Sequence, residues 1–197
     1  YIYQSSERVY FKSTKERSKD YILHIGTFEK RKDLLTLVKA FKLFKENTKS
    51  NLKLVLAGSK NFNGNKQIYK EIKRYILKNN LFSSVIMPGY INKKQAIYYF
   101  NNAFAYVFPS IDEGFGIPLI EAMRAQVPVI CSDIEIFKEI GNDSVIYFKK
   151  QDENDLCNKL KLISEDKTTI QIVISKGKKR ANMFNQVNFI KGFEKLY

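Results

Sequence analysis

Two glutamates, Glu113 and Glu121, stand at the two ends of a short segment that contains two glycines and a proline. Glycine lets a ligand approach backbone N–H groups, and proline suits the first turn of a helix, so the segment predicts a turn followed by a helix that starts near Pro118. The N-terminus of such a helix favours an anion, phosphate in particular. On this interpretation Glu121 falls in the first helical turn and Glu113 just before it.

The two carboxylates would repel a phosphate, so we expect them to recognise another part of the ligand. A carboxylate accepts paired hydrogen bonds, which suits the vicinal hydroxyl groups of a sugar or a ribose. A site that binds a phosphate between two groups that accept hydrogen bonds from hydroxyls suits a nucleotide sugar. The alternative for each glutamate alone is an acid that interacts favourably with the dipole of the helix.

A second polar segment, from Gly26 to Asp33, contains three consecutive cations, the last two of which are Arg31 and Lys32. These two could offset the charge of a diphosphate, and Asp33 could cap the helix that follows. Such cations would serve glycosyl transfer, because charge that builds up on the departing nucleoside diphosphate must be stabilised. The sequence contains no Asp-x-Asp triplet, so we expect no metal and no cofactor besides the substrate. A solvated basic turn is the alternative for Arg31 and Lys32.

Short apolar runs alternate along the chain with stretches of helical periodicity. The runs predict strands at residues 21–25, 52–57, 85–87, 104–108, 127–131 and 145–148. Helices are predicted from residue 34, at 66–78, 93–101 and 117–125, as a turn near 137, and at 156–163, 170–184 and 189–196. This alternation indicates an α/β, Rossmann-like parallel sheet with helices on both faces and a C-terminal helical tail. Ligands of such sheets bind outside the carboxyl ends of the strands, where both polar segments fall.

The composition fits one compact domain, with 197 residues of which 44% are apolar. No apolar run approaches the roughly 18 residues of a membrane span, and residues 1–20 lack the features of a signal peptide, so we expect a cytoplasmic protein. Two cysteines and one histidine cannot build a disulfide framework or a zinc site. The net charge of +14 would attract polyanions, acidic lipid or phosphorylated substrates, although a solvated face is the alternative explanation of many lysines.

The segment from Glu113 to Glu121 resembles the E-x7-E signature of the group 1 retaining glycosyltransferases, whose GT-B fold consists of two facing Rossmann-like domains. Residues 21–35 are similar to the family's strand and its Gly-Thr-x-x-x-Arg-Lys loop. Residues 132–140 are similar to the region after the signature, and residues 180–197 to the closing helix. The resemblance implies a donor-binding domain over residues 21–197, with residues 1–20 as a linker or a remnant of the interdomain region.

The resemblance also implies roles for individual residues. Glu121 would bind the ribose hydroxyls and Glu113 those of the transferred sugar, while Arg31 and Lys32 would contact the diphosphate. Glu113, Arg31 and Lys32 are thereby the expected catalytic residues. The other implied donor-binding residues are Gly26, Thr27, Gly89, Tyr90, Ile91, Gly114, Phe115, Gly116 and Ile117, with the loop at residues 88–91 beside the nucleotide base. Members of the family retain the anomeric configuration, by a front-face path in which the leaving phosphate assists the acceptor hydroxyl.

The loop variant resembles that of mannosyl- and related transferases of bacterial surface polysaccharides, which makes GDP-mannose the expected donor and a glycan or lipid-linked molecule the expected acceptor. Three features depart from the family. Thr27 stands where many members have arginine, which would leave the diphosphate to Arg31 and Lys32. Gln126 stands where glycine usually follows the signature helix, so a left-handed C-cap would be strained or the turn built differently.

The third departure is an absent N-terminal acceptor domain, without which we expect little transfer. The chain is then either cut from a longer enzyme, which the abrupt start at Tyr1 favours, or one subunit of a split enzyme.

Two other functions are compatible with parts of the sequence. A basic nucleic-acid-binding module without enzymatic activity would explain the charge and the 12 Tyr and 15 Phe. Most of these aromatics fall at core spacing and no nucleic-acid motif is present, so we expect no nucleic acid as a partner. A dinucleotide oxidoreductase is disfavoured because residues 26–33 lack G-x-G-x-x-G. The basic surface could also make peripheral contact with an anionic membrane.

Overall fold

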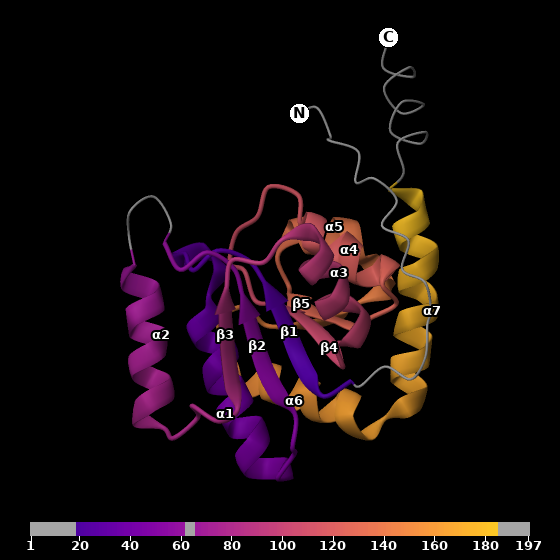
Figure 1. The fold of residues 1–197 in the computed structure, drawn as a ribbon. Helices are drawn as coiled ribbons and strands as arrows, with labels where there is room; N and C mark the ends of the chain where they lie inside the picture. The colour runs from indigo at the N-terminus through magenta and orange to yellow at the C-terminus, as the bar shows by residue number, and fades with distance from the viewer. Residues whose placement is uncertain (1–18, 62–65, 185–197) are drawn as a thin grey trace.

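The computed structural model of the protein describes residues 19–61 and 66–184 (Figure 1). The predicted linker over residues 1–20 and the predicted last helix at 189–196 lie wholly or almost wholly outside these residues. No helix in the described part of the chain is long and apolar enough to span a lipid bilayer.

The described strands form one sheet, ordered β3-β2-β1-β4-β5-β6, in which all neighbours pair in parallel. Their bounds are β1 (Tyr21–Ile25), β2 (Lys53–Ala57), β3 (Val85–Gly89), β4 (Ala105–Phe108), β5 (Val129–Ser132) and β6 (Ile146–Phe148). The predicted Rossmann-like sheet is confirmed. The chain reverses its direction of winding between β1 and β4, and a crevice opens at such a switch point.

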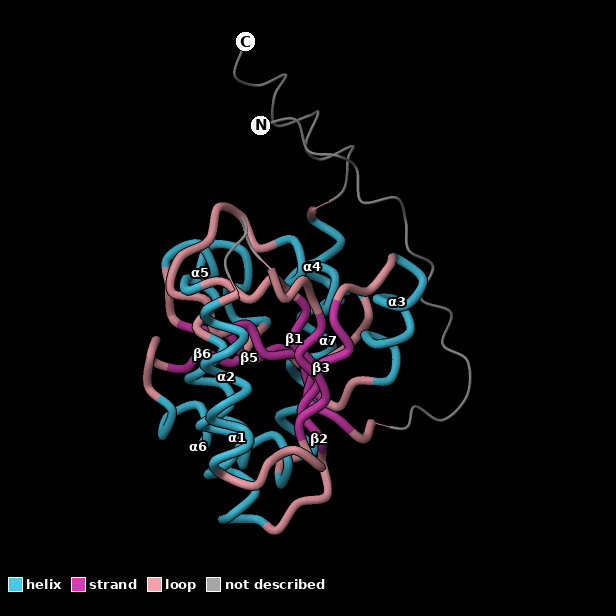
Figure 2. The backbone as a smooth tube through the Cα atoms, turned by 60° about the vertical axis from the view of Figure 1, so that its left-hand side comes forward, coloured by secondary structure: helices cyan, strands magenta, loops and turns pink. Residues whose placement is uncertain are grey.

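Helices cover both faces of this sheet, as Figure 2 shows. Their bounds are α1 (Leu34–Thr48), α2 (Gln67–Lys78), α3 (Lys93–Asn102), α4 (Ile117–Arg124), α5 (Glu135–Gly141), α6 (Glu153–Glu165) and α7 (Lys167–Met183), with 3-10 turns η1 (Lys30–Lys32) and η2 (Asn142–Ser144). The predicted helices are therefore confirmed within the described residues, and the turn expected near Phe137 is the helix α5.

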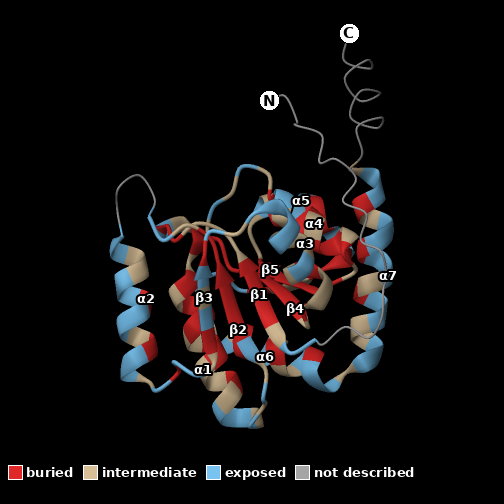
Figure 3. Ribbon diagram, viewed as in Figure 1, coloured by how far each residue is buried: buried red, intermediate tan, exposed pale blue. Residues whose placement is uncertain are grey.

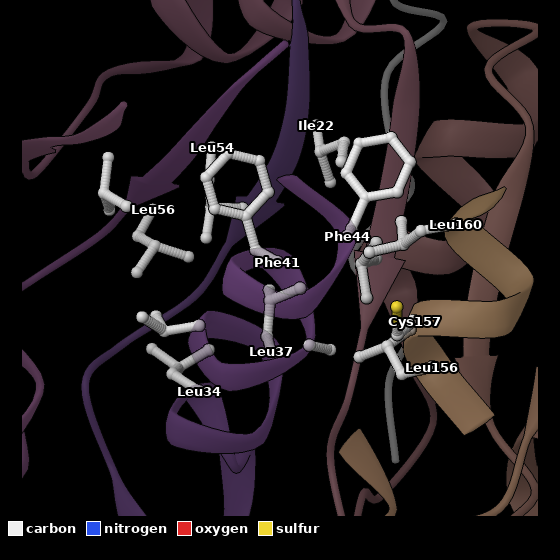
Figure 4. Packing of buried hydrophobic residues seen from close by; sticks show 14 of the residues in the cluster. Ile22, Leu34, Leu37, Phe41, Phe44, Leu54, Leu56, Leu156, Cys157 and Leu160 are labelled. Carbon is white, nitrogen blue, oxygen red and sulfur yellow. The ribbon is translucent and has the colours of Figure 1, made fainter. Parts of the chain in front are cut away.

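The hydrophobic core consists of two clusters, one on each face of the sheet. The first joins the strands to α1, α2 and α6, and Figure 4 shows Phe41 of α1 beside Leu54 of β2 and Phe44 of α1 beside Leu160 of α6. The second joins the strands to α3, α4 and α5 and includes Ala181 of α7. Strands buried on both faces explain the nearly continuous apolar runs of the sequence.

The turn after α4 accommodates Gln126 in a left-handed conformation, with φ of 56°. The N–H of Gln126 donates to the Met123 carbonyl at 3.0 Å, and the N–H of Val127 donates to the Ala122 carbonyl at 3.0 Å. These two bonds form the Schellman motif that ordinarily has glycine at the left-handed position. Of the two outcomes expected at Gln126, the structure has the left-handed cap, in a conformation that a side chain disfavours.

Candidate functional site

The two polar segments lie side by side at the carboxyl edge of the sheet, which is the upper edge in Figure 1. One follows β1 and the other follows β4, the two strands that flank the switch point. The N–H of Ile111 donates to the carbonyl of Arg31 at 2.8 Å, so backbone atoms join the two loops directly. The fold thus brings together the residues in which the sequence predicted a site.

The loop after β1 is held against the end of β2. The N–H of Gly26 donates to the Ala57 carbonyl at 2.9 Å, and the N–H of Phe28 donates to the Ser59 carbonyl at 3.1 Å. The loop then closes in η1, which was not predicted, and ends at Asp33. Asp33 occupies the N-cap position of α1 as expected, but with φ of 46° and no capping hydrogen bond from its side chain. The predicted N-cap position of Asp33 is therefore confirmed, and its carboxyl faces Thr36 of the first turn without a capping hydrogen bond of ordinary geometry.

The loop after β4 leads into α4 through Gly116, whose φ is 84°. A Cβ at Gly116 would lie 3.0 Å from the Phe137 ring, so both the backbone conformation and the space favour glycine here. The helix begins at Ile117 with Pro118 in its first turn. Glu121 consequently lies in the second turn, and its predicted place in the first turn is wrong.

Glu113 is the centre of an ion cluster between the loops. Its Oε1 accepts hydrogen bonds from Lys32 Nζ and from Ser110 Oγ, the latter at 2.8 Å, and its Oε2 lies 2.8 Å from Arg31 Nη1. The Glu113 side chain is 8% exposed and that of Lys32 9%. Burial alone would raise the pKa of Glu113, but the bonds and charges of Lys32, Ser110 and Arg31 outweigh it and hold the pKa below its ordinary value.

A second carboxylate, Glu29, holds Arg31 from the other side. Its Oε2 accepts from Arg31 Nε at 3.0 Å and its Oε1 accepts from Arg31 Nη2 at 3.1 Å, which is a bidentate pair. Thr27 Oγ1 donates to the same Oε1 at 2.6 Å. Arg31, Lys32, Glu29 and Glu113 carry two positive and two negative charges, so the cluster is neutral as it stands.

The remaining predicted donor-binding residues line the same edge. Glu121 is half-buried, and burial raises the pKa of its carboxyl against the opposing charges of Arg124 and Lys93. In the loop that starts at Gly89, the end of β3, Tyr90 is 79% exposed, and the Gly89 carbonyl accepts from the Gly58 N–H at 2.8 Å. Ile91 follows Tyr90 in the loop after β3, and Gly114 and Phe115 belong to the loop after β4. Ile117, the first residue of α4, is 49% exposed.

Three residues of the site region were not predicted from the sequence, namely Glu29, Ser110 and His24. Ser110 is fully buried and fixes Glu113, while its own carbonyl accepts a hydrogen bond from Ser132 Oγ. His24 is fully buried in β1, and its Nδ1 lies 3.0 Å from the Val107 carbonyl. The position of Ser110 directly after a strand and a proline was the one available signal; a histidine inside an apolar run gave none.

Comparison with known sequences gives a family match. A sequence model of the family described as "Glycosyl transferases group 1" matches residues 5–180. O-antigen chain mannosyltransferase B of Escherichia coli is 27% identical over 168 residues, which cover 85% of this chain and 43% of the relative. O-antigen chain mannosyltransferase RfbU of Salmonella typhimurium is 29% identical over 164 residues, which cover 83% of this chain and 44% of the relative. The chain therefore spans less than half the length of either relative.

Solved structures share the fold. Sucrose-phosphate synthase from Thermosynechococcus elongatus superposes with a TM-score of 0.79 at 26% identity, over 92% of this chain and 45% of that one. The C-terminal domain of a glycosyl transferase group 1 family protein from Francisella tularensis superposes with a TM-score of 0.75 at 18% identity, over 87% of this chain and 93% of that domain. The second likeness bears on the fold alone.

Proposed function

We propose that this chain, which belongs to the group 1 glycosyl transferases, is the part of such an enzyme that binds a nucleotide-diphosphate sugar. In this proposal its sheet is one half of a GT-B fold, and a second domain would face the carboxyl edge described above. The observation that carries the proposal is the meeting of Glu113 with Arg31 and Lys32 at the switch point. An acceptor of sugar hydroxyls thereby lies next to two cations suited to a diphosphate.

In this proposal the donor lies across the two loops. Arg31 and Lys32 stabilise the charge that develops on the departing nucleoside diphosphate, and Glu113 accepts hydrogen bonds from the transferred sugar. Glu121 accepts from the ribose hydroxyls, and the exposed ring of Tyr90 lies by the base. The backbone around Gly114 lies beside the sugar and the phosphates, where no atom within 4 Å would meet an added Cβ.

The proposed reaction is a retaining hexosyl transfer without a metal, in which the leaving phosphate assists the acceptor hydroxyl and no protein nucleophile takes part. GDP-mannose is the proposed donor, because two relatives are named as O-antigen chain mannosyltransferases. A glycan or lipid-linked molecule is the proposed acceptor. Transfer would need an N-terminal acceptor domain or a partner subunit, since the relatives are more than twice as long as the matched region.

We expect calorimetry to detect binding of GDP-mannose, and Glu121→Ala to weaken it by about tenfold or more, the loss of one or two hydrogen bonds to a charged group. UDP-glucose, GDP and UDP titrated in parallel identify the base. The control is Glu139→Ala, which removes one exposed acid in α5 and should change nothing.

Raising the salt concentration separates this function from nucleic-acid binding. Binding to a nucleic-acid backbone weakens steeply with salt, whereas hydrogen bonds to Glu121 should persist. If no nucleotide binds while single-stranded nucleic acid binds in a salt-dependent way, the proposal is wrong.

We further propose that the protein works in the cytoplasm, at the inner face of an anionic membrane, and that α2 makes the contact. The outward face of α2 is exposed in Figure 3 and includes Lys70, Lys73 and Arg74, next to Leu77 at 55% exposure. Phe82, just beyond the helix, is 67% exposed. Cations beside exposed apolar side chains suit a surface of acidic lipid headgroups.

Vesicle sedimentation tests this contact. Replacing Lys70, Lys73 and Arg74 by alanine should reduce binding to phosphatidylserine-containing vesicles by about a hundredfold, because each of the three cations near such a surface contributes about 1 kcal/mol and about 1.4 kcal/mol corresponds to a factor of ten. The matched control replaces Lys167, Lys178 and Lys179 of α7, which removes the same charge from another exposed surface. Equal affinity of the unmodified chain for anionic and neutral vesicles would rule the contact out.

A further inference from the structure

The two cations at the switch point, Arg31 and Lys32, already share a carboxylate. Lys32 Nζ donates to Glu113 Oε1, and Arg31 Nη1 lies 2.8 Å from Glu113 Oε2. Lys32 is nearly buried, with its Nζ 5.1 Å from the centre of the Phe108 ring. A diphosphate that binds both cations must therefore compete with the Glu113 carboxylate.

The cost of this competition depends on what else the ligand offers to Glu113. If a bare nucleoside diphosphate took the two cations, Glu113 would keep the hydrogen bond from Ser110 Oγ at 2.8 Å but lose both opposite charges while still buried. A buried carboxylate stripped of its partners is strongly unfavourable. A sugar attached to the diphosphate would supply hydroxyl donors in their place.

We infer that Glu113 makes the site select the sugar-loaded nucleotide over the spent nucleoside diphosphate. The inference rests on the proposed function and adds a second role for Glu113, as an internal anion that exchanges places with the diphosphate. With the sugar present, its hydroxyls hold Glu113 away from Lys32 and Arg31. Once the sugar has been transferred, Glu113 returns to the cations and displaces the diphosphate, so the same residue favours donor binding and product release.

Calorimetry with GDP and GDP-mannose, and with UDP and UDP-glucose as a second pair, tests the inference on the chain itself. Glu113→Gln should bind the bare diphosphate about tenfold more tightly than the unmodified chain, while the preference for the sugar-loaded form shrinks at least as much. Asp112→Asn is the matched control, since it removes a neighbouring exposed acid that contacts Arg31 only through its carbonyl. The same gain in Asp112→Asn would reduce the effect to general electrostatics and overturn the inference.

A second variant guards against misfolding of Glu113→Gln, which leaves Lys32 without its anion. Ser110→Ala removes the donor that Glu113 keeps when only a diphosphate is bound, so the preference for the sugar-loaded form should widen about threefold or more. Opposite changes in the two variants support the exchange, and an unchanged preference in Ser110→Ala overturns it. If the unmodified chain binds none of the four ligands, the proposed function fails rather than this inference.

Discussion

Gly58→Ala is expected to lower the free energy of unfolding by about 3 kcal/mol or more, the combined effect of a backbone conformation that side chains avoid and a direct collision. Gly58 has φ of 152°, and a Cβ there would lie 1.8 Å from the carbonyl oxygen of Gly26. The N–H of Gly58 also donates to the Gly89 carbonyl at 2.8 Å. The new methyl group would therefore force apart the loops that follow β1, β2 and β3, and ligand binding should fall with stability.

Urea denaturation followed by far-UV circular dichroism measures this effect. Gly114→Ala is the matched control, because an added Cβ at Gly114 has no neighbour within 4 Å and its φ is not in the left-handed region. It should unfold within about 0.5 kcal/mol of the unmodified chain, as surface substitutions usually do. An equally small change in the free energy of unfolding of Gly58→Ala would contradict the close approach of Gly58, after β2, to Gly26, after β1.

The second large effect is a loss of stability in mild acid caused by His24. His24 is fully buried, its Nδ1 lies 3.0 Å from the Val107 carbonyl, and its Nε2 has no hydrogen-bond partner among the described residues. Burial lowers the pKa of His24 to about 4, against the opposing hydrogen bond to Val107. The neutral ring must donate its Nδ1 proton to the carbonyl, which leaves Nε2 as an acceptor.

The sign of the pH dependence follows from this lowered pKa. Above about pH 6.5, the ordinary pKa of histidine, the ring is neutral in both states and its contribution to stability is complete. Between that value and about pH 4 the unfolded chain binds a proton that the folded chain refuses, so stability falls as pH falls. The slope is at most about 1.4 kcal/mol per pH unit, which amounts to about 2 kcal/mol between pH 7 and pH 5.

Since the sequence has a single histidine, one substitution isolates the effect. Urea denaturation measures the free energy of unfolding at pH 7 and at pH 5. Its decrease from pH 7 to pH 5 should be about 2 kcal/mol smaller for His24→Phe than for the unmodified chain. The comparison cancels the titration of carboxylates, which both proteins share. Identical pH dependence of the two proteins would show that His24 is protonated as readily in the folded chain as in the unfolded one.

The order of strands and helices was predictable because this sheet buries both faces of its strands. The runs that end at Ile25 and Phe108 are apolar almost throughout, and the polar loops after them fall at the carboxyl edge of any parallel sheet. That geometry was enough to place Arg31 and Lys32 near Glu113. The roles of these residues towards a donor stay predictions.

Other features depend on details that no apolar pattern encodes. Glu29 became a partner of Arg31 because η1 turns the chain back within two residues, and a single 3-10 turn leaves no periodicity in a sequence. Glu121 lies in the second turn and not in the predicted first turn, because the backbone around Gly116 sets the start of α4. The pairing of Lys32 with Glu113 in place of a free cation could not be foreseen either, since it depends on side-chain rotamers.

The hydrogen bond from Ile111 to the carbonyl of Arg31 has a consequence for how such proteins can diverge. It joins segments that lie far apart in the chain, and the pairing of Arg31 and Lys32 with Glu113 balances their charges across the same junction. A recombination that exchanged one segment and kept the other would leave a buried charge without its counterpart. The loops after β1 and β4 should therefore evolve together. A substitution that changes the charge of one loop should be tolerated only with a compensating substitution in the other.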